Sequence, residues 1–100
     1  MTNANLTLKI FGQADCGPCR ILKAVIDGER SDIEALGVVI EHVDLTKGIN
    51  ADRDAIIEQY GIMGTPVTVI EKDGKVVTRF NGLFNMKELY ETLEYAKTAN

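Results

Sequence analysis

The chain has 100 residues, of which 45% are apolar and 26% charged, and its net charge is −4. This length fits one domain, and folding at this size buries about 65% of the surface of the extended chain, enough for one apolar core. The acidic balance argues against a nucleic-acid or anionic-membrane surface, because both need a basic face. No apolar run approaches the roughly 20 residues of a membrane span.

The first residues of the chain are polar. Met1–Asn5 carries no charged side chain and lacks the basic and apolar regions of a secretory signal. We therefore expect a cytoplasmic protein, and we expect it to act as a monomer.

The two cysteines of the sequence, Cys16 and Cys19, are separated only by Gly17 and Pro18. Two cysteines are too few for a four-cysteine zinc site. With His42, the one histidine of the sequence, as a third ligand, a fourth ligand would still be missing, so we predict no metal site. His42 on a strand is more typical of a packed or edge residue than of a ligand or base. A disulfide across so short a loop restrains the unfolded chain little and makes a poor structural crosslink. Redox exchange is therefore the chemistry that we expect of the pair.

Hydrophobic spacing predicts the elements of the first half of the chain. Alternation over Leu6–Phe11 indicates a strand, and Pro18 suits the first turn of a helix. Helical spacing continues beyond Gly28, which is expected to bend or interrupt this helix, until Gly37 ends it. Val38–Asp44 is apolar enough to form an internal strand.

The second half is predicted to hold a helix, a hairpin and a last helix. These are a short helix capped at Asn50 or Asp52 and ending at Tyr60, strands over Val67–Glu71 and Val76–Phe80, and a helix capped by Asn85. Asp73-Gly74 is a strong signal for a hairpin turn between the two strands.

The order of the elements predicts an α/β fold, β-α-β-α-β-β-α, in one domain over residues 1–100. The first two strands are joined by a helix and should be parallel, with a right-handed crossover. The last two strands form the hairpin. We expect a four-stranded mixed sheet in the order 2-1-3-4, with helices on both faces.

Two motifs, in this order, resemble the thioredoxin family. Cys16–Cys19 opens a helix after a strand, which matches the family's redox motif. Gly64–Pro66, which opens a later strand, is similar to the segment that carries the family's cis-proline. The resemblance covers nearly the whole chain. It implies a thioredoxin-like fold and a protein-disulfide reductase, a dithiol electron carrier that needs no cofactor beyond a redox-active Cys16–Cys19 disulfide.

Several positions depart from the family pattern. Cys16 is preceded by 15 residues, which leaves no room for the extra N-terminal strand and helix of full thioredoxins, so we expect the smaller, glutaredoxin-sized version of the fold. Asp15 stands where thioredoxins usually have Trp. The family's buried Asp falls on Ile10, and its Lys partner falls on Ile40. An apolar pair is therefore expected in place of an ionisable one.

The resemblance also implies the roles of the two cysteines. Cys16 precedes the helix, whose unpaired N–H groups and positive dipole end lower the pKa of such a thiol, and it is expected to attack substrate disulfides. Cys19, expected to be the more buried of the two, resolves the mixed disulfide. Asp15 opposes the thiolate, so Asp15→Asn is expected to lower the pKa of Cys16. Without the buried Asp, Cys19 needs another proton acceptor, which the sequence does not name.

Substrate binding is expected around the cysteines and the later proline. Gly17 and Pro18 leave room for the substrate, and a cis Pro66 would present the backbone of Thr65 for strand-like pairing with it. The residues that the resemblance implies for substrate binding are Gly17, Pro18, Met63, Gly64, Thr65, Pro66 and Gly82.

The electron donor and the client stay open. The simplest donor is a thioredoxin reductase that uses NADPH, and ribonucleotide reductase is a candidate client. Alternatively, a glutaredoxin would take electrons from glutathione, with Arg20 and Lys23 as candidate ligands for the glutathione carboxylate. Two further alternatives are a module that bridges two chains through a cluster or metal held at Cys16, and a chaperone-like subunit with idle cysteines.

Overall fold

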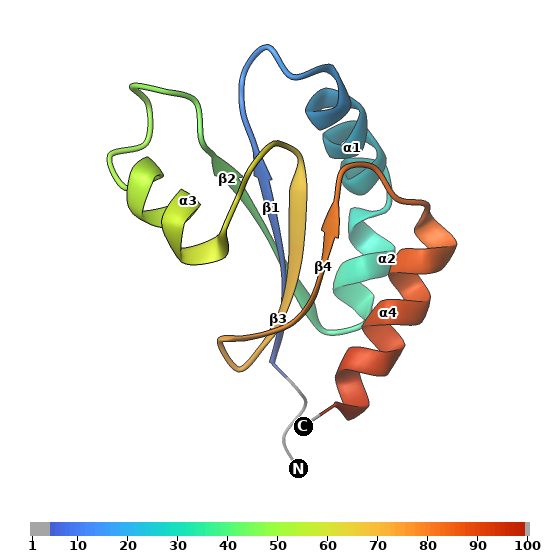
Figure 1. Cartoon of the computed structure of the whole chain (residues 1–100). Helices are drawn as coiled ribbons and strands as arrows, with labels where there is room; N and C mark the ends of the chain where they lie inside the picture. The colour runs from blue at the N-terminus through green and yellow to red at the C-terminus, as the bar shows by residue number, and fades with distance from the viewer. Residues whose placement is uncertain (1–4, 100) are drawn as a thin grey trace.

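A four-stranded sheet in the order β2-β1-β3-β4 forms the centre of the structure, a computed structural model that describes residues 5–99 (Figure 1). β1 (Leu6–Gly12) pairs parallel with β2 (Val38–Asp44) and antiparallel with β3 (Val67–Lys72), and β4 (Lys75–Asn81) completes the hairpin. The predicted sheet order is confirmed. The predicted domain, residues 1–100, includes residues 1–4 and 100, which lie outside the described part of the chain.

Helices cover both faces of the sheet, as predicted (Figure 1). The elements on one face are α1 (Gly17–Gly28), α2 (Arg30–Ala35) and α4 (Met86–Thr98), and α3 (Arg53–Tyr60) covers the other. The helix expected to bend or break at Gly28 is interrupted there, since α1 ends at Gly28 and α2 begins after Glu29.

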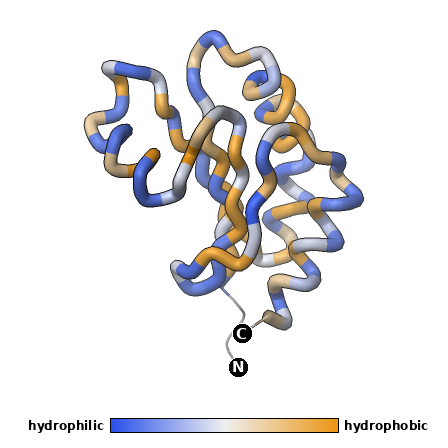
Figure 2. The backbone as a smooth tube through the Cα atoms, in the orientation of Figure 1, coloured by the Kyte–Doolittle hydropathy of each residue, from blue (hydrophilic) through white to orange (hydrophobic). Residues whose placement is uncertain are grey.

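The sheet separates two apolar clusters. Leu8 and Ile10 on β1 pack with α1, α2 and α4, whereas Phe11 packs on the side of α3. In Figure 2 apolar residues gather on the central strands. A slip of one residue would exchange the two faces of β1, so burial on both sides fixes its register. This register determines which residues stand at the end of β1, where the cysteines follow.

Local chemistry explains the turns. Asp73 and Gly74 both have positive φ, 53° and 82°, which matches a two-residue hairpin turn of the primed type. Gly61 ends α3 in the left-handed conformation, and the Asn85 side chain caps α4 by accepting from the N–H of Glu88 at 2.8 Å. The predicted turn at Asp73-Gly74 and the predicted cap of α4 by Asn85 are confirmed.

Candidate active site

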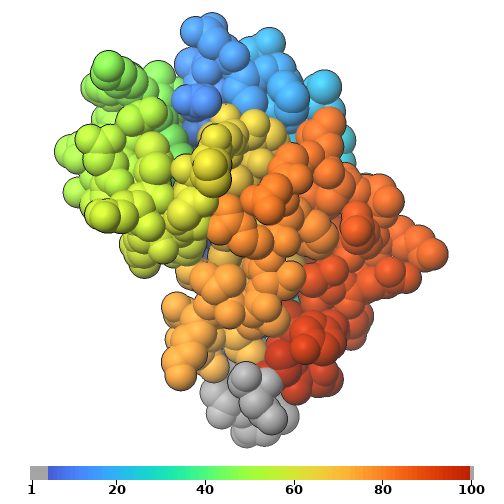
Figure 3. Space-filling model, in the orientation of Figure 1, coloured from blue at the N-terminus to red at the C-terminus, as the bar shows by residue number. Residues whose placement is uncertain are grey.

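Two segments far apart in the sequence meet at one end of the sheet. Phe11 on β1 is the register partner of Val67 on antiparallel β3, so the residues after β1 adjoin the residues before β3. Figure 3 shows these segments in contact, the blue atoms ahead of α1 against the yellow atoms ahead of β3. The sheet therefore brings the Cys16–Cys19 segment to the Gly64–Pro66 segment.

Cys16 and Cys19 form a disulfide with their Cα atoms 5.2 Å apart. Cys16 is the N-cap of α1, and its Sγ accepts the N–H of Cys19 at 3.2 Å. Pro18 lies in the first turn, where a missing N–H costs no helical hydrogen bond. The first turn of α1 carries no acidic residue, so the positive end of the helix acts on Cys16 without local opposition from the helix itself. In the reduced protein this arrangement favours the Cys16 thiolate.

Thr65 lies directly beside Cys16. The Thr65-Pro66 peptide bond is cis, as the resemblance implied. The Thr65 carbonyl oxygen is 3.7 Å from Cys16 Sγ, and the hydroxyl Oγ1 donates to the same sulfur at 3.5 Å. Gln13 Nε2 donates to Thr65 Oγ1 at 3.0 Å, which occupies a lone pair of the oxygen and leaves its proton free for the sulfur. Sequence reasoning missed Gln13, since nothing in its spacing links it to Thr65.

The expectation that Cys19 is the more buried cysteine was wrong. Cys16 is buried, with 9% of its surface exposed, whereas Cys19 is half-buried. The contacts with Thr65 explain the low exposure of Cys16, and the free side of Cys19 faces a cavity.

A groove of about 470 Å³ lies beside the cis-proline, and we call it the cis-proline groove. Of the residues predicted to bind substrate, it is lined by Met63, Gly64, Thr65, Pro66 and Gly82. Met63 is 99% exposed, so it packs against almost nothing in the folded chain. Gly17 and Pro18 do not line the groove and lie at the start of α1. Arg79 also lines it, and sequence reasoning missed this residue.

A second cavity, of about 220 Å³, adjoins the other cysteine, and we call it the Cys19 cavity. Gly12 lines it, and a Cβ built at this glycine would stand 3.5 Å from Cys19 Sγ. His42 lines it as well and is the register partner of Ile10, while Ile40 pairs with Leu8. Ile10 and Ile40, on which the family's ionisable pair falls, both belong to the larger apolar cluster, and the residue directly opposite Ile10 is the ionisable His42.

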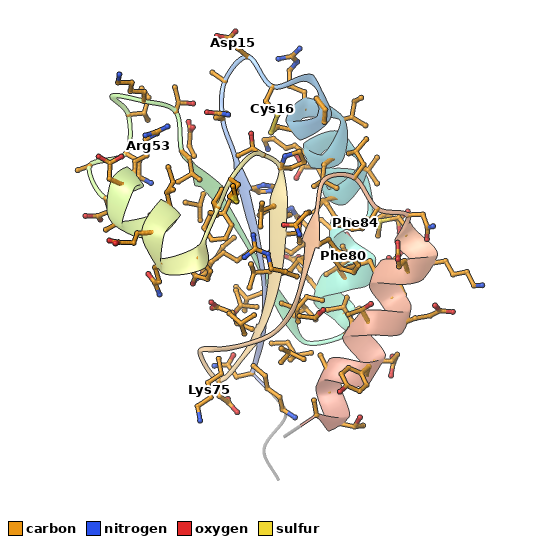
Figure 4. The ribbon with its side chains drawn as sticks, in the orientation of Figure 1. Asp15, Cys16, Arg53, Lys75, Phe80 and Phe84 are labelled. Atoms are coloured by element: carbon orange, nitrogen blue, oxygen red, sulfur yellow. A yellow bond between two sulfur atoms is a disulfide. The ribbon has the colours of Figure 1, made fainter. Side chains whose placement is uncertain are left out.

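Asp15 stands at the outer tip of the loop before α1 and points away from the body of the molecule (Figure 4). Its φ of 59° is left-handed, a conformation that Asp tolerates better than most residues. The side chain is exposed, so water screens its charge from Cys16.

Comparison with known proteins matches residues 2–97 to a family model described as a thioredoxin-like domain. The chain belongs to the thioredoxin family. It is 31% identical to a thioredoxin of Listeria monocytogenes over 93 residues, 92% of this chain and 84% of the relative. It is 32% identical to a thioredoxin of Chlamydia caviae over 68 residues, 68% of this chain and 60% of the relative.

A solved thioredoxin also matches the fold. The structure of Fasciola hepatica thioredoxin superposes with a TM-score of 0.74 at 28% identity, over 93% of this chain and 82% of that chain. With a Cys16–Cys19 disulfide on this fold, the protein is a thiol-disulfide oxidoreductase that acts on disulfide substrates and exchanges electrons with a reductase. Nothing in the comparisons favours the glutaredoxin alternative. None of the helices among residues 5–99 has the length and apolar character to cross a membrane.

Proposed function

We propose that the protein reduces protein disulfides, with Cys16 as the attacking thiol and Cys19 as the resolving thiol. One observation carries the assignment. Cys16 Sγ is the sulfur at the helix N-cap that accepts the N–H of Cys19 and the hydroxyl of Thr65. Both donors stabilise a thiolate at Cys16, and the thiolate is the nucleophile in exchange.

The reaction has two exchange steps. The Cys16 thiolate attacks one sulfur of the substrate disulfide, forms a mixed disulfide, and releases the other substrate sulfur as a thiolate. Cys19, as a thiolate, then attacks Cys16 Sγ, which forms the Cys16–Cys19 disulfide and releases the second substrate sulfur. The substrate gains two electrons and the protein loses two. The disulfide itself is the redox group, so the reaction needs no metal and no further cofactor.

The cis-proline groove is the proposed binding site for the polypeptide around the attacked disulfide. The exposed Met63 offers an apolar contact, and the Gly64-Thr65 backbone offers strand-like hydrogen bonds. Gly82 has no side chain to obstruct the groove. Gly17 and Pro18 lie between the two cysteines at the start of α1, and neither side chain is bulky enough to block the approach of a substrate.

The proposed electron donor is a thioredoxin reductase that uses NADPH, and the proposed clients are disulfide proteins such as ribonucleotide reductase. Donor and client both belong to a reducing compartment, so we place the protein in the cytoplasm. Glutathione is the second candidate donor, with Arg20 and Lys23 beside the Cys19 cavity as the charges that would meet its carboxylates.

Trapping of the mixed disulfide tests the roles of the cysteines. We expect Cys19→Ser, incubated with oxidised insulin, to accumulate a covalent adduct through Cys16 that dithiothreitol releases. Cys16→Ser serves as the matched control and should form little adduct, because its remaining thiol lacks both donors. Adduct formation by Cys16→Ser alone would reverse the roles, and adduct formation by neither variant would refute the proposal.

A further inference from the structure

The resolving step needs a group that takes the proton of Cys19, because only the thiolate attacks the mixed disulfide. At the position of the family's buried Asp this chain has Ile10, which is 5% exposed and packs in the larger apolar cluster. Ile10 cannot accept a proton, so another group must do so if the proton is to leave through the protein.

The Cys19 cavity offers a route for this proton. Its volume of about 220 Å³ exceeds by far the roughly 15 Å³ that one water molecule requires. Gly12 presents no side chain between Cys19 Sγ and this space. A short chain of water molecules can therefore connect the sulfur with other groups that line the cavity.

Two of the groups that line the cavity can accept a proton, His42 and Asp44. Asp44 is the weaker base, because its carboxylate accepts the N–H of Thr46 at 2.8 Å and hydrogen bonds from Thr46 lower the pKa of Asp44 below its ordinary value. Arg20 and Lys23 also line the cavity, but both are cations at neutral pH and serve only to attract the Cys19 thiolate.

The surroundings of His42 keep its imidazole ready to receive a proton. Burial and then the charge of Lys23 lower the pKa of His42, and Arg30 acts in the same direction, so the ring is neutral at neutral pH. Asp27 Oδ1, 3.5 Å from His42 Nε2, opposes these effects and stabilises the ring once it is protonated. The charged groups that shift the pKa of His42 are thus Lys23 and Asp27 on α1 and Arg30 on α2. Arg20 and Asp44 line the same cavity as His42.

We propose that His42 is the proton acceptor for Cys19 in the resolving step, reached through water in the Cys19 cavity. This inference rests on the proposed function. The Cys19 S–H proton passes through water to the free ring nitrogen of His42, the Cys19 thiolate attacks Cys16 Sγ, and the substrate sulfur leaves as a thiolate. His42 then returns its proton to solvent, and the electron balance of the exchange is unchanged.

A two-phase release assay separates this step from the first attack. The reduced protein is mixed with the aromatic disulfide 5,5′-dithiobis(2-nitrobenzoate) in a stopped-flow instrument. The attack of Cys16 releases one coloured thiolate, and the resolution by Cys19 releases the second. We compare the wild type with His42→Gln and with the competing variant Asp44→Asn. Glu41→Gln is the matched control, because Glu41 is the neighbouring residue on β2 and pairs with Lys9 instead of lining the cavity.

We expect His42→Gln to slow the second release at least about tenfold at neutral pH, since general bases contribute factors of this size or more, and to leave the first release unchanged. The deficit should shrink as the pH rises and hydroxide removes the Cys19 proton. Added imidazole should restore the second release in His42→Ala. If His42→Ala does not fold, His42→Gln with its pH profile is the test.

Three results would overturn the inference. These are an unchanged second release in His42→Gln, a slow second release in Asp44→Asn alone, and a deficit that neither imidazole nor high pH repairs. Failure of the proposed function has a different signature. In that case the first release would survive in Cys16→Ser, or the second release would survive in Cys19→Ser.

Discussion

Thr65→Val removes one hydrogen-bond donor from Cys16 and keeps the shape of the side chain. The Thr65 hydroxyl donates to Cys16 Sγ at 3.5 Å, and Gln13 Nε2 holds the hydroxyl oxygen at 3.0 Å. A thiolate gains more from such a donor than a thiol does. We therefore expect the substitution to raise the pKa of Cys16.

The size of the effect follows from the length of this hydrogen bond. A hydrogen bond to a charged group contributes about 1.5–3 kcal/mol, and a separation of 3.5 Å to sulfur places this one at the low end. About 1.4 kcal/mol corresponds to a tenfold change in the ionisation equilibrium. The N–H of Cys19 at 3.2 Å remains in the variant. The thiolate fraction of Cys16 should thus fall about tenfold at a given pH below the pKa.

The rate of alkylation of Cys16 by iodoacetamide, followed against pH by mass spectrometry, measures this pKa. Thr68→Val is the matched control, because it makes the same substitution on β3 at a residue whose hydroxyl makes no hydrogen bond with Cys16. An alkylation profile of Thr65→Val that coincides with the wild type would refute the donation by Thr65. An equal displacement in Thr68→Val would show that the effect does not depend on the contact.

Thr68→Val should raise the free energy of unfolding by about 1–2 kcal/mol, because within residues 5–99 the Thr68 hydroxyl is buried without a hydrogen-bond partner. Urea unfolding measures this change, and a lower free energy of unfolding would contradict the prediction. The Tyr90 hydroxyl donates to Glu29 at 2.6 Å, which raises the pKa of Tyr90 to about 12. The stability that this bond adds is therefore complete below pH 10 and lost as the pH rises towards 12. Tyr90→Phe should lower the free energy of unfolding by about 1 kcal/mol at neutral pH. In this variant the free energy of unfolding should also fall less steeply between pH 10 and 12 than in the wild type. If the free energy of unfolding fell equally with alkaline pH in the wild type and in Tyr90→Phe, this would contradict the contact. Asp15→Asn should lower the pKa of Cys16 and raise its thiolate fraction less than about twofold, because Asp15 is exposed. A tenfold rise of the thiolate fraction in the alkylation assay would contradict this.

The parts of the fold that depend on local chemistry could be predicted from the sequence. Alternation along β1 and the capping preference of Asn85 act within a few residues, and both appear in the structure as expected. Asp73 and Gly74 likewise form the turn that their own backbone preferences favour. The cysteine spacing with the later Thr65-Pro66 identified the family, because motifs hold residues that must meet in space.

The rest of the site arises from contacts between distant segments. Gln13 meets Thr65 across 52 positions of the sequence, and no periodicity relates the two. The partner of Ile10 is His42 because of the register between β1 and β2, which the packing of the intervening helices determines. The Cys19 cavity owes its opening to a side chain that Gly12 lacks. Such a space becomes visible only when the surrounding elements are in place.

Reduction of insulin by the protein, driven in parallel by NADPH with thioredoxin reductase and by NADPH with glutathione and glutathione reductase, tests the central claim most directly. The claim predicts turnover with thioredoxin reductase that is lost in Cys16→Ser. Turnover mainly with glutathione would contradict the proposed donor. No turnover with either donor, from a protein whose Cys16–Cys19 pair is reduced at the start, would contradict the assignment as a protein-disulfide reductase.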